Sequence, residues 1–241
     1  MTTPLFNRRG GYRRLDTFML ATLVYYATVE FCKAHIKSGR QQEQMTQAAR
    51  SGRQNIAEGS ERSATSTETE IKLTDVARAS LAELQLDYED FINLAGHHPW
   101  PDDAPESREL WRLRLERMND GEYSAHHFSK TVAENRAMFA GWLNPADPLR
   151  MANALVRLCE RADFLLRKQL DGIGERFAEE GGFREQMTRV RLEARDAQNP
   201  ACPKCGKPMR KLKAKTGPNT GKEFWGCTGF QEGCRGTRDC E

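Results

Sequence analysis

Two pairs of cysteines near the C-terminus constrain this chain more than any other feature. Cys202 and Cys205 are separated by two residues, and Cys227 and Cys234 by six. A two-residue spacing forms a tight turn in which both thiolates face one metal ion, and two pairs complete a closed tetrahedral site of the structural zinc type. The sequence therefore predicts one structural Zn²⁺, although the second spacing is wider than usual.

The other cysteines favour a metal site over disulfide bonds. Five of the seven cysteines lie in the last 40 residues, whereas Cys32 and Cys159 stand alone in helical patterns. Secreted proteins that depend on disulfides spread the bridges through the fold. We therefore expect a reducing, cytoplasmic location. Cys240 is interpreted as a spare surface thiol, with substitution for one of the four ligands as the alternative.

Positive charge is concentrated in the same segment. Residues 200–241 hold nine Lys and Arg against four Asp and Glu, while the rest of the chain is slightly acidic. So short a segment has few core residues. Zinc binding, worth roughly 10–16 kcal/mol in small finger peptides, would be needed for it to fold.

Helical periodicity dominates the remainder of the chain. Apolar residues recur at helical spacing over residues 15–37, 41–58 and about 65–95, and again from Pro148 onward. The first of these segments carries two apolar stripes, whereas a surface helix needs one. The second stripe is expected to be covered either by a neighbouring subunit or by residues 97–147.

Local signals predict where these helices begin and end. Gly59 is expected to end the second helix in a left-handed conformation. Thr65 with Glu68, and Thr67 with Glu70, form candidate capping boxes for the third helix. Further expectations are helices at about 106–118, 122–142 and 183–197, and a break in the last long helix near residues 172–174.

The apolar stretch at residues 17–29 resembles a membrane segment only superficially. It is too short to span a bilayer, and Glu30 and Lys33 follow it directly. The mean hydropathy of the whole chain is −0.74. We expect a core helix here, and neither a signal peptide nor a membrane partner.

One segment resembles a known family. Residues 52–84 read GRQNIAEGSERSATSTETEIKLTDVARASLAEL. They resemble the four-helix-bundle proteins found in intervening sequences of bacterial 23S rRNA genes, a family that includes accessory proteins of diversity-generating retroelements. The motifs concerned are NIAEG at residues 55–59, Arg62, and ASLAEL at residues 79–84. The physical alternative is that Asn55, Glu58 and Arg62 only stabilise a corner between helices.

The resemblance covers about residues 12–95 and 148–172, and it has consequences for fold and assembly. It implies an antiparallel four-helix bundle that forms a homo-oligomer, often a pentamer, and binds nucleic acid, with a reverse transcriptase as an expected partner. The predicted fold is therefore all-α. An antiparallel four-helix bundle at residues 12–197 contains a helical insert at residues 97–147, and a small zinc ribbon follows at residues 200–241.

The cysteine-containing segment is similar to the C-terminal zinc fingers of bacterial type I topoisomerases. The similarity rests on CPKCG at residues 202–206, Met209, EFWGC at residues 223–227, Gly229 and Phe230. In that family the zinc ribbon binds single-stranded DNA. The similarity therefore implies single-stranded DNA or RNA as a partner.

The side chains of this segment suit such a partner. Basic groups contact phosphates, and each base stacked on a flat ring is worth about 1–3 kcal/mol. One aromatic residue is expected in the ribbon's core, and Trp225 is expected to be the best stacking surface. The predicted nucleic-acid contacts are Lys204, Lys207, Arg210, Lys211, Lys213, Lys215, Lys222, Phe224, Trp225 and Phe230.

No catalytic site is expected. His97 and His98 are adjacent in the sequence, as are His126 and His127, so the side chains of each pair point in different directions. No phosphate-binding loop, nucleophile elbow or pair of carboxylates stands out.

Two functions follow from these features. The first is a non-enzymatic accessory protein, an oligomeric bundle that presents basic zinc ribbons to single-stranded DNA or RNA and assists a reverse transcriptase or another mobile-element enzyme. The alternative is an oligomeric scaffold whose zinc segment docks a partner protein. Binding to a nucleic-acid strand that weakens steeply with salt separates the first function from the second.

Overall fold

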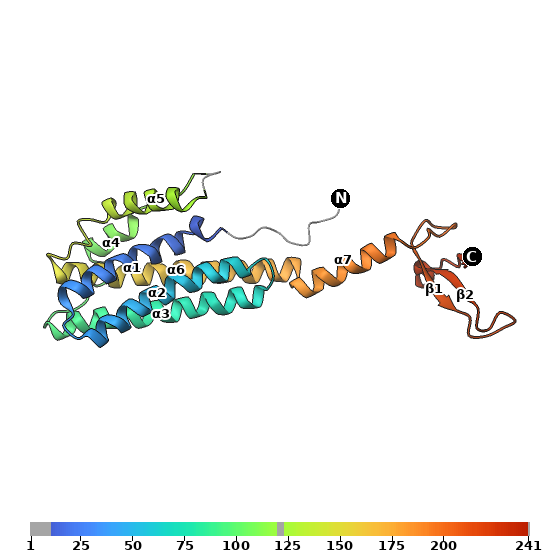
Figure 1. Cartoon of the computed structure of the whole chain (residues 1–241), viewed down its shortest axis with the longest axis horizontal. Helices are drawn as coiled ribbons and strands as arrows, with labels where there is room; N and C mark the ends of the chain where they lie inside the picture. The colour runs from blue at the N-terminus through green and yellow to red at the C-terminus, as the bar shows by residue number, and fades with distance from the viewer. Residues whose placement is uncertain (1–10, 120–122, 241) are drawn as a thin grey trace. The chain divides into compact units, whose positions relative to one another are not determined.

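The computed structural model describes residues 11–119 and 123–240, so the expected helix start at residue 122 lies outside it. The chain divides into two compact units, one within residues 6–181 and one within residues 182–241. The first unit is helical, and the second holds one helix and a small sheet (Figure 1). The predicted all-α class with a small C-terminal cysteine-rich module is confirmed. The boundary expected at residues 197–200 stays a prediction about folding units.

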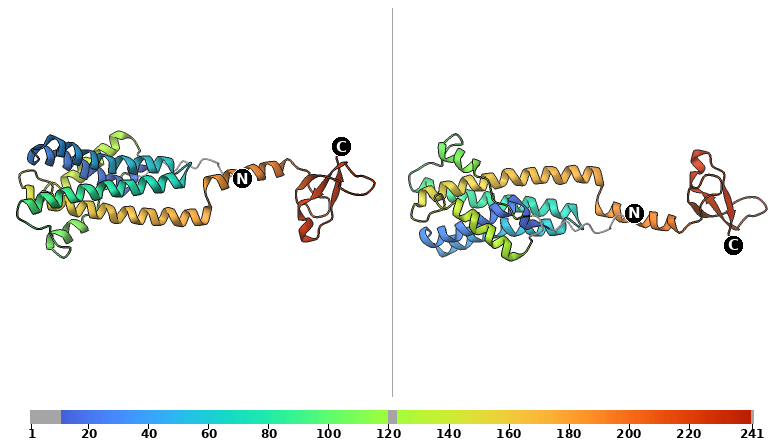
Figure 2. Two further views of the ribbon diagram at one scale, coloured as in Figure 1. Left: turned by 90° about the horizontal axis from the view of Figure 1, so that it is seen from below. Right: turned by 90° about the horizontal axis from the view of Figure 1, so that it is seen from above.

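Four helices form the bundle: α1 (Asp16–His35), α2 (Gly39–Arg62), α3 (Thr67–Leu94) and α6 (Pro148–Glu180). Each packs against two others, in the cyclic order α1, α2, α3, α6 (Figure 2). Short connections make the first three helices antiparallel in turn. The bundle is therefore closed by α6, which returns between α3 and α1.

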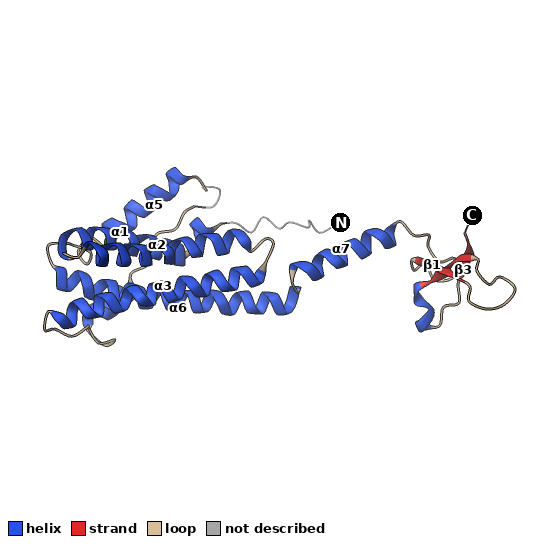
Figure 3. Cartoon of the chain, turned by 60° about the horizontal axis from the view of Figure 1, so that its bottom comes forward, coloured by secondary structure: helices blue, strands red, loops and turns tan. Residues whose placement is uncertain are grey.

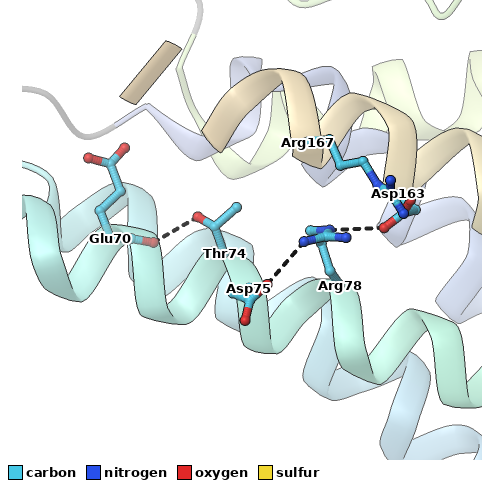
Figure 4. A network of polar contacts seen from close by, with 6 residues as sticks. All are labelled: Glu70, Thr74, Asp75, Arg78, Asp163 and Arg167. Carbon is cyan, nitrogen blue, oxygen red and sulfur yellow. Dashed lines mark hydrogen bonds and ion pairs between the residues drawn. The ribbon is translucent and has the colours of Figure 1, made fainter. Parts of the chain in front are cut away.

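Contacts between α3 and α6 show that these two helices are also antiparallel. Glu70, near the start of α3, lies 3.6 Å from Arg176 near the end of α6. Further along α3, Arg78 Nε lies 2.9 Å from Asp163 Oδ1 (Figure 4). Arg78 also contacts Asp75 on its own helix at 3.0 Å. Because Arg78 and Asp163 are partly exposed, their ion pair aligns the helices more than it stabilises them.

The centre of the bundle is apolar except for a few satisfied hydroxyl groups. Tyr88 and Phe31 are fully buried, with ring centroids 5.2 Å apart in an edge-to-face arrangement. The Tyr88 hydroxyl donates to Thr28 Oγ1 at 2.8 Å. Thr28 in turn donates to the Val24 carbonyl at 2.7 Å. The buried hydroxyl groups of Tyr88 and Thr28 are therefore both paired.

The insert covers part of the apolar surface of α1, and it is one of the two covers that the sequence left open. Its helix α5 (Ala125–Met138) packs against α1, and its helix α4 (Pro105–Arg112) packs against α6. The rings of Phe18 on α1 and Phe128 on α5 lie 5.3 Å apart. Both insert helices are shorter than the sequence predicted.

The prediction that Gly59 ends α2 is wrong. The helix continues to Arg62, and Gly59 is buried against α3. A Cβ on Gly59 would lie 3.4 Å from both the Glu70 carbonyl oxygen and Leu73 Cβ. A Cβ on Gly52, two turns earlier, would lie 2.8 Å from the Leu81 side chain. These glycines permit a close approach of two helices, rather than a left-handed turn.

Two further boundary predictions are also wrong. The α3 helix is capped by Ser66, whose Oγ accepts from the Thr69 N–H at 3.2 Å, and not by the threonine capping boxes. The α6 helix runs through Gly172 and Gly174 to Glu180 without a break. The side chain of Ile173 is buried, so packing outweighs the weak helix propensity of its two neighbours.

The C-terminal unit contains α7 (Phe183–Ala197) and a three-stranded antiparallel sheet. The strands, drawn red in Figure 3, are β1 (Met209–Lys213), β2 (Glu223–Cys227) and β3 (Thr237–Asp239). Strand β2 lies between the other two. A short 3₁₀ helix, η2 (Thr228–Glu232), follows β2. In the part of the chain that the structure describes, no helix is long and apolar enough to cross a membrane.

Candidate metal centre and ribbon face

The four predicted cysteine ligands come together at one end of the sheet. The Sγ atoms of Cys202, Cys205, Cys227 and Cys234 all lie within 4.8 Å of one another. Cys202 and Cys234 are 3.7 Å apart, and Cys205 and Cys227 are 3.4 Å apart. A tetrahedral zinc ion with Zn–S bonds of about 2.3 Å separates its ligands by about 3.8 Å. The donor set and its spacing therefore fit Zn²⁺.

Local backbone structure explains both cysteine spacings. The first pair lies in a turn closed by the Gly206 N–H donating to the Cys202 carbonyl at 2.9 Å, with Gly206 at φ +74°. In the second pair, η2 occupies five of the six intervening residues. Gly233 then adopts φ +95°, and Cys234 donates its N–H to the Gly229 carbonyl at 3.1 Å. The wider spacing accommodates a helical turn without separating the thiols.

Backbone N–H groups point at two of the sulfur atoms. The Lys204 N–H donates to Cys202 Sγ at 3.4 Å, and the Gly229 N–H donates to Cys227 Sγ at 3.3 Å. Such bonds orient a ligand and stabilise its negative charge.

The thiol pKa values differ within the cluster. Burial disfavours the Cys202 thiolate, but hydrogen bonds from the backbone N–H groups of Lys204 and Cys205 and from two neighbouring thiols together lower the pKa of Cys202 to about 7. Burial, followed by the neighbouring Cys205 thiol, raises the pKa of Cys227 to about 12. Four thiolates this close repel one another, so a cation is needed for all four to ionise together. A bound zinc ion would supply that charge and hold the ribbon's ends together.

Gly236 completes the centre, and sequence reasoning missed it. A Cβ at this position would lie 2.3 Å from Cys202 Sγ and 3.6 Å from Cys234 Sγ. The Gly236 carbonyl also accepts from the Cys227 N–H at 3.0 Å. Only glycine leaves room for the sulfur atoms here. The available signal was the glycine two residues after the fourth cysteine.

The hydrophobic core beside the cysteines is very small. Its buried residues are Cys202, Met209 and Cys227, and Trp225 packs against them. Cys240 follows β3 and is not part of the four-thiol group. Among the described residues, these four cysteines form the only cluster of His, Cys, Asp or Glu placed to hold a metal ion. The histidine pairs that the sequence set aside form no such cluster there.

The pairing of the strands aligns a basic and aromatic row across one face of the sheet. Lys211 on β1 pairs with Trp225 on β2, which pairs with Arg238 on β3. Directly paired residues in an antiparallel sheet project to the same side. Arg210 lies on the opposite side of β1 from Lys211. Sequence reasoning grouped Arg210 with Lys211 and did not include Arg238.

Two of the predicted lysines have acidic partners. Lys211 Nζ lies 2.7 Å from Glu223 Oε2, and Lys207 contacts Glu232. The hydrogen bond to Glu223 raises the pKa of Lys211, and the same bond lowers the pKa of Glu223. The other predicted lysines are exposed, one beside the first cysteine turn and three near the β1–β2 loop: Lys204, Lys213, Lys215 and Lys222.

The three predicted aromatic contacts differ in exposure. Phe230 on η2 is 54% exposed, and the Arg235 guanidinium lies 3.7 Å from its ring centroid. Phe224 and Trp225 are half-buried on opposite sides of β2. Leu212 covers Gly226 on the Phe224 side, where a Cβ on Gly226 would lie 2.6 Å from Leu212. Phe230 is therefore the most accessible ring, and Trp225 is partly engaged in the core.

Comparison with known proteins connects part of this chain to a topoisomerase. The chain is 44% identical over 61 residues to "DNA topoisomerase I, plasmid" of Xylella fastidiosa (strain 9a5c). The match covers 25% of this chain and 8% of the relative, so the chain spans a small fraction of that protein's length. No family model matches the chain, and no solved structure matches it. The helix-bundle family is therefore not confirmed, whereas the match and the four-cysteine cluster support a zinc finger of the topoisomerase type.

Proposed function

We propose that the C-terminal sheet is a zinc ribbon that binds single-stranded nucleic acid, and that the chain is a non-enzymatic cytoplasmic accessory protein. The row of Lys211, Trp225 and Arg238 carries this proposal. An indole between two cations offers a base one flat face and offers the flanking phosphates a charge on either side. The match to a DNA topoisomerase supports DNA as the preferred strand.

The charge balance of the ribbon fits a partner of high negative charge. A zinc ion with four thiolates carries a net charge of −2, which offsets part of the basic excess of residues 200–241. Lys207 and Lys211 are also engaged with carboxylates. The positive surface is therefore moderate, and stacking must supply part of the affinity.

The role assigned to the helical unit rests on the resemblance of residues 52–84. A homo-oligomer of this bundle would present several ribbons together, and their weak individual affinities would combine through effective concentration. The pentamer and the reverse transcriptase partner belong to this proposal and depend on that resemblance.

Fluorescence anisotropy of the zinc-loaded chain tests the proposal. Labelled single-stranded DNA, single-stranded RNA and duplex DNA are titrated at two salt concentrations. If about five phosphates are neutralised, log affinity for a single strand falls with log salt at a slope of roughly −3.5. The double variant K211A/W225A should weaken strand binding about 100-fold, because it removes one stacked base and one charge.

The matched control is Arg210→Ala, which removes a charge from the opposite side of the same strand. Its effect should be a few-fold at most. Equal losses in R210A and K211A/W225A would assign binding to overall charge instead of this face. Absence of binding to every strand at low salt would overturn the proposal and favour docking of a protein partner.

A further inference from the structure

A cleft between the insert and the bundle is lined only by residues of the helical unit. It lies where α4 packs against α6 and has a volume of about 510 Å³. This volume is in the range of small-molecule sites. Its lining combines three arginines, two carboxylates, a hydroxyl and an indole: Asp102, Ser107, Arg108, Trp111, Arg112, Arg157 and Glu160.

The cleft contains buried polar atoms that have no hydrogen-bond partner. Ser107 is only 5% exposed, and its Oγ is unpaired. Arg157 Nε is likewise buried and unpaired. Within residues 11–119 and 123–240, these are the buried side-chain nitrogen and oxygen atoms left without a partner. Folded proteins satisfy nearly all such groups, so two exceptions in one cleft call for a partner that supplies their hydrogen bonds.

Charge in the cleft favours an anion. Arg157 is already engaged by Glu160, at 3.0 Å, and by Asp102. Arg108 and Arg112 lie one helical turn apart on α4 and are exposed, and neither forms an ion pair within the described part of the chain. Planar guanidinium groups at this spacing suit the oxygens of a phosphate.

An aromatic side chain, Trp111, lines the cleft next to these arginines. Trp111 lies between them on α4 and is 45% exposed. Its ring is held by Phe164 of α6, with the centroids 5.6 Å apart. The two ring planes are inclined at 60°, so Phe164 contacts the indole while the exposed part of Trp111 stays accessible to a flat ring.

We propose that this cleft binds a mononucleotide. The phosphate lies on Arg108 and Arg112, and the base stacks on Trp111. Ser107 Oγ and Arg157 Nε supply hydrogen bonds from the floor of the cleft. The proposal uses residues of the helical unit alone, so it stands whether or not the ribbon binds a strand.

Isothermal titration of the whole zinc-loaded chain tests this site, with AMP, adenosine and inorganic phosphate as separate probes. AMP should bind once per chain with a dissociation constant below about 1 mM. Adenosine and phosphate should each bind at least tenfold more weakly. Phosphate binding as tightly as AMP, or no saturable AMP binding at all, would overturn the proposal.

The variant Ser107→Ala separates a ligand role from a structural one. Removing an unpaired buried hydroxyl should leave the melting temperature unchanged or raise it. The same change should weaken AMP binding about three- to tenfold, because one hydrogen bond is lost. Unchanged AMP affinity in S107A would contradict the assignment of the cleft.

Three variants test the charge and the location of the site. R108A/R112A should weaken AMP binding about 100-fold. Arg114→Ala removes a nearby exposed arginine that does not line the cleft, so its affinity should match the parent chain. The ribbon variant K211A/W225A should also bind AMP normally. Loss of AMP binding in that variant would place the nucleotide on the ribbon and overturn the proposal.

Discussion

The helical unit and the ribbon are stabilised in different ways. The bundle buries a continuous set of apolar side chains, with Tyr88, Phe31 and Leu20 among the fully buried ones. The ribbon buries Met209 and two cysteines, with Trp225 packed partly against them. Hydrophobic burial can hold the first without any ligand, whereas the second relies on four sulfur atoms meeting at one point. A perturbation of one unit should therefore leave the other intact.

Loss of the metal should produce the largest difference between the two units. In the variant Cys227→Ser, or with a chelator, we expect the ribbon to unfold, because zinc contributes on the order of 10 kcal/mol to modules of this size. Far-ultraviolet circular dichroism should retain its helical signal. Amide resonances of residues 200–240 should lose their dispersion in NMR spectra.

The control for this experiment is Cys240→Ser, because Cys240 stands outside the four-thiol group. It should keep one zinc ion per chain. A ribbon that stays folded without metal would show that its small core suffices, and the contrast between the units would disappear.

Within the bundle, the largest effect of a single methyl group is expected at the α2–α3 contact. A Cβ on Gly52 would lie 2.8 Å from the Leu81 side chain. Gly52→Ala should destabilise the helical unit by about 1–3 kcal/mol through overpacking. Urea denaturation followed by circular dichroism measures this change.

An alanine at an uncrowded position of the same unit should change the stability in the opposite direction. A Cβ on Gly174, inside α6, meets nothing within 4 Å. Gly174→Ala should stabilise the unit by about 0.5–1 kcal/mol. Equal effects in the two variants would mean that helix propensity, and not close packing, governs both positions.

Alkaline pH should weaken the bundle through two buried thiols. Burial raises the pKa of Cys32 to about 11 and raises that of Cys159 further. Above pH 9 the unfolded chain releases these protons while the folded chain keeps them, so the free energy of unfolding falls as pH rises. Each such proton contributes about 1.4 kcal/mol per pH unit. Urea midpoints of the helical signal at pH 8, 9 and 10 measure the slope, and Cys32→Ala should reduce it.

The smallest effect is expected at the surface of α2. Arg62 lies 3.9 Å from Glu58, and both side chains are more than half exposed. Arg62→Ala should change the stability of the bundle by less than about 0.5 kcal/mol. A loss of strand binding in this variant, with stability unchanged, would instead give a functional role to Arg62, the partner of Glu58 in the NIAEG motif.

Sequence reasoning succeeded where one residue type has one physical meaning. Thiols at this spacing have few uses besides binding a metal. The long segments with helical periodicity are compatible only with helices. Gly59 illustrates the limit, because glycine serves both as a helix stop and as a close-contact residue. Only the position of α3 shows which role applies. The row of Lys211, Trp225 and Arg238 depends on strand register, which the spacing of residues along the chain does not reveal.

The cover that α5 forms over α1 has a consequence for synthesis on the ribosome. Phe18 is made early, whereas its neighbour Phe128 follows more than a hundred residues later. At about 5–20 residues per second, the part of α1 around Phe18 stays uncovered for some 5–20 s until α5 has been synthesised. During this interval the nascent chain exposes an apolar helix surface to its surroundings. The insert thus makes the start of the chain dependent on its middle for protection from aggregation.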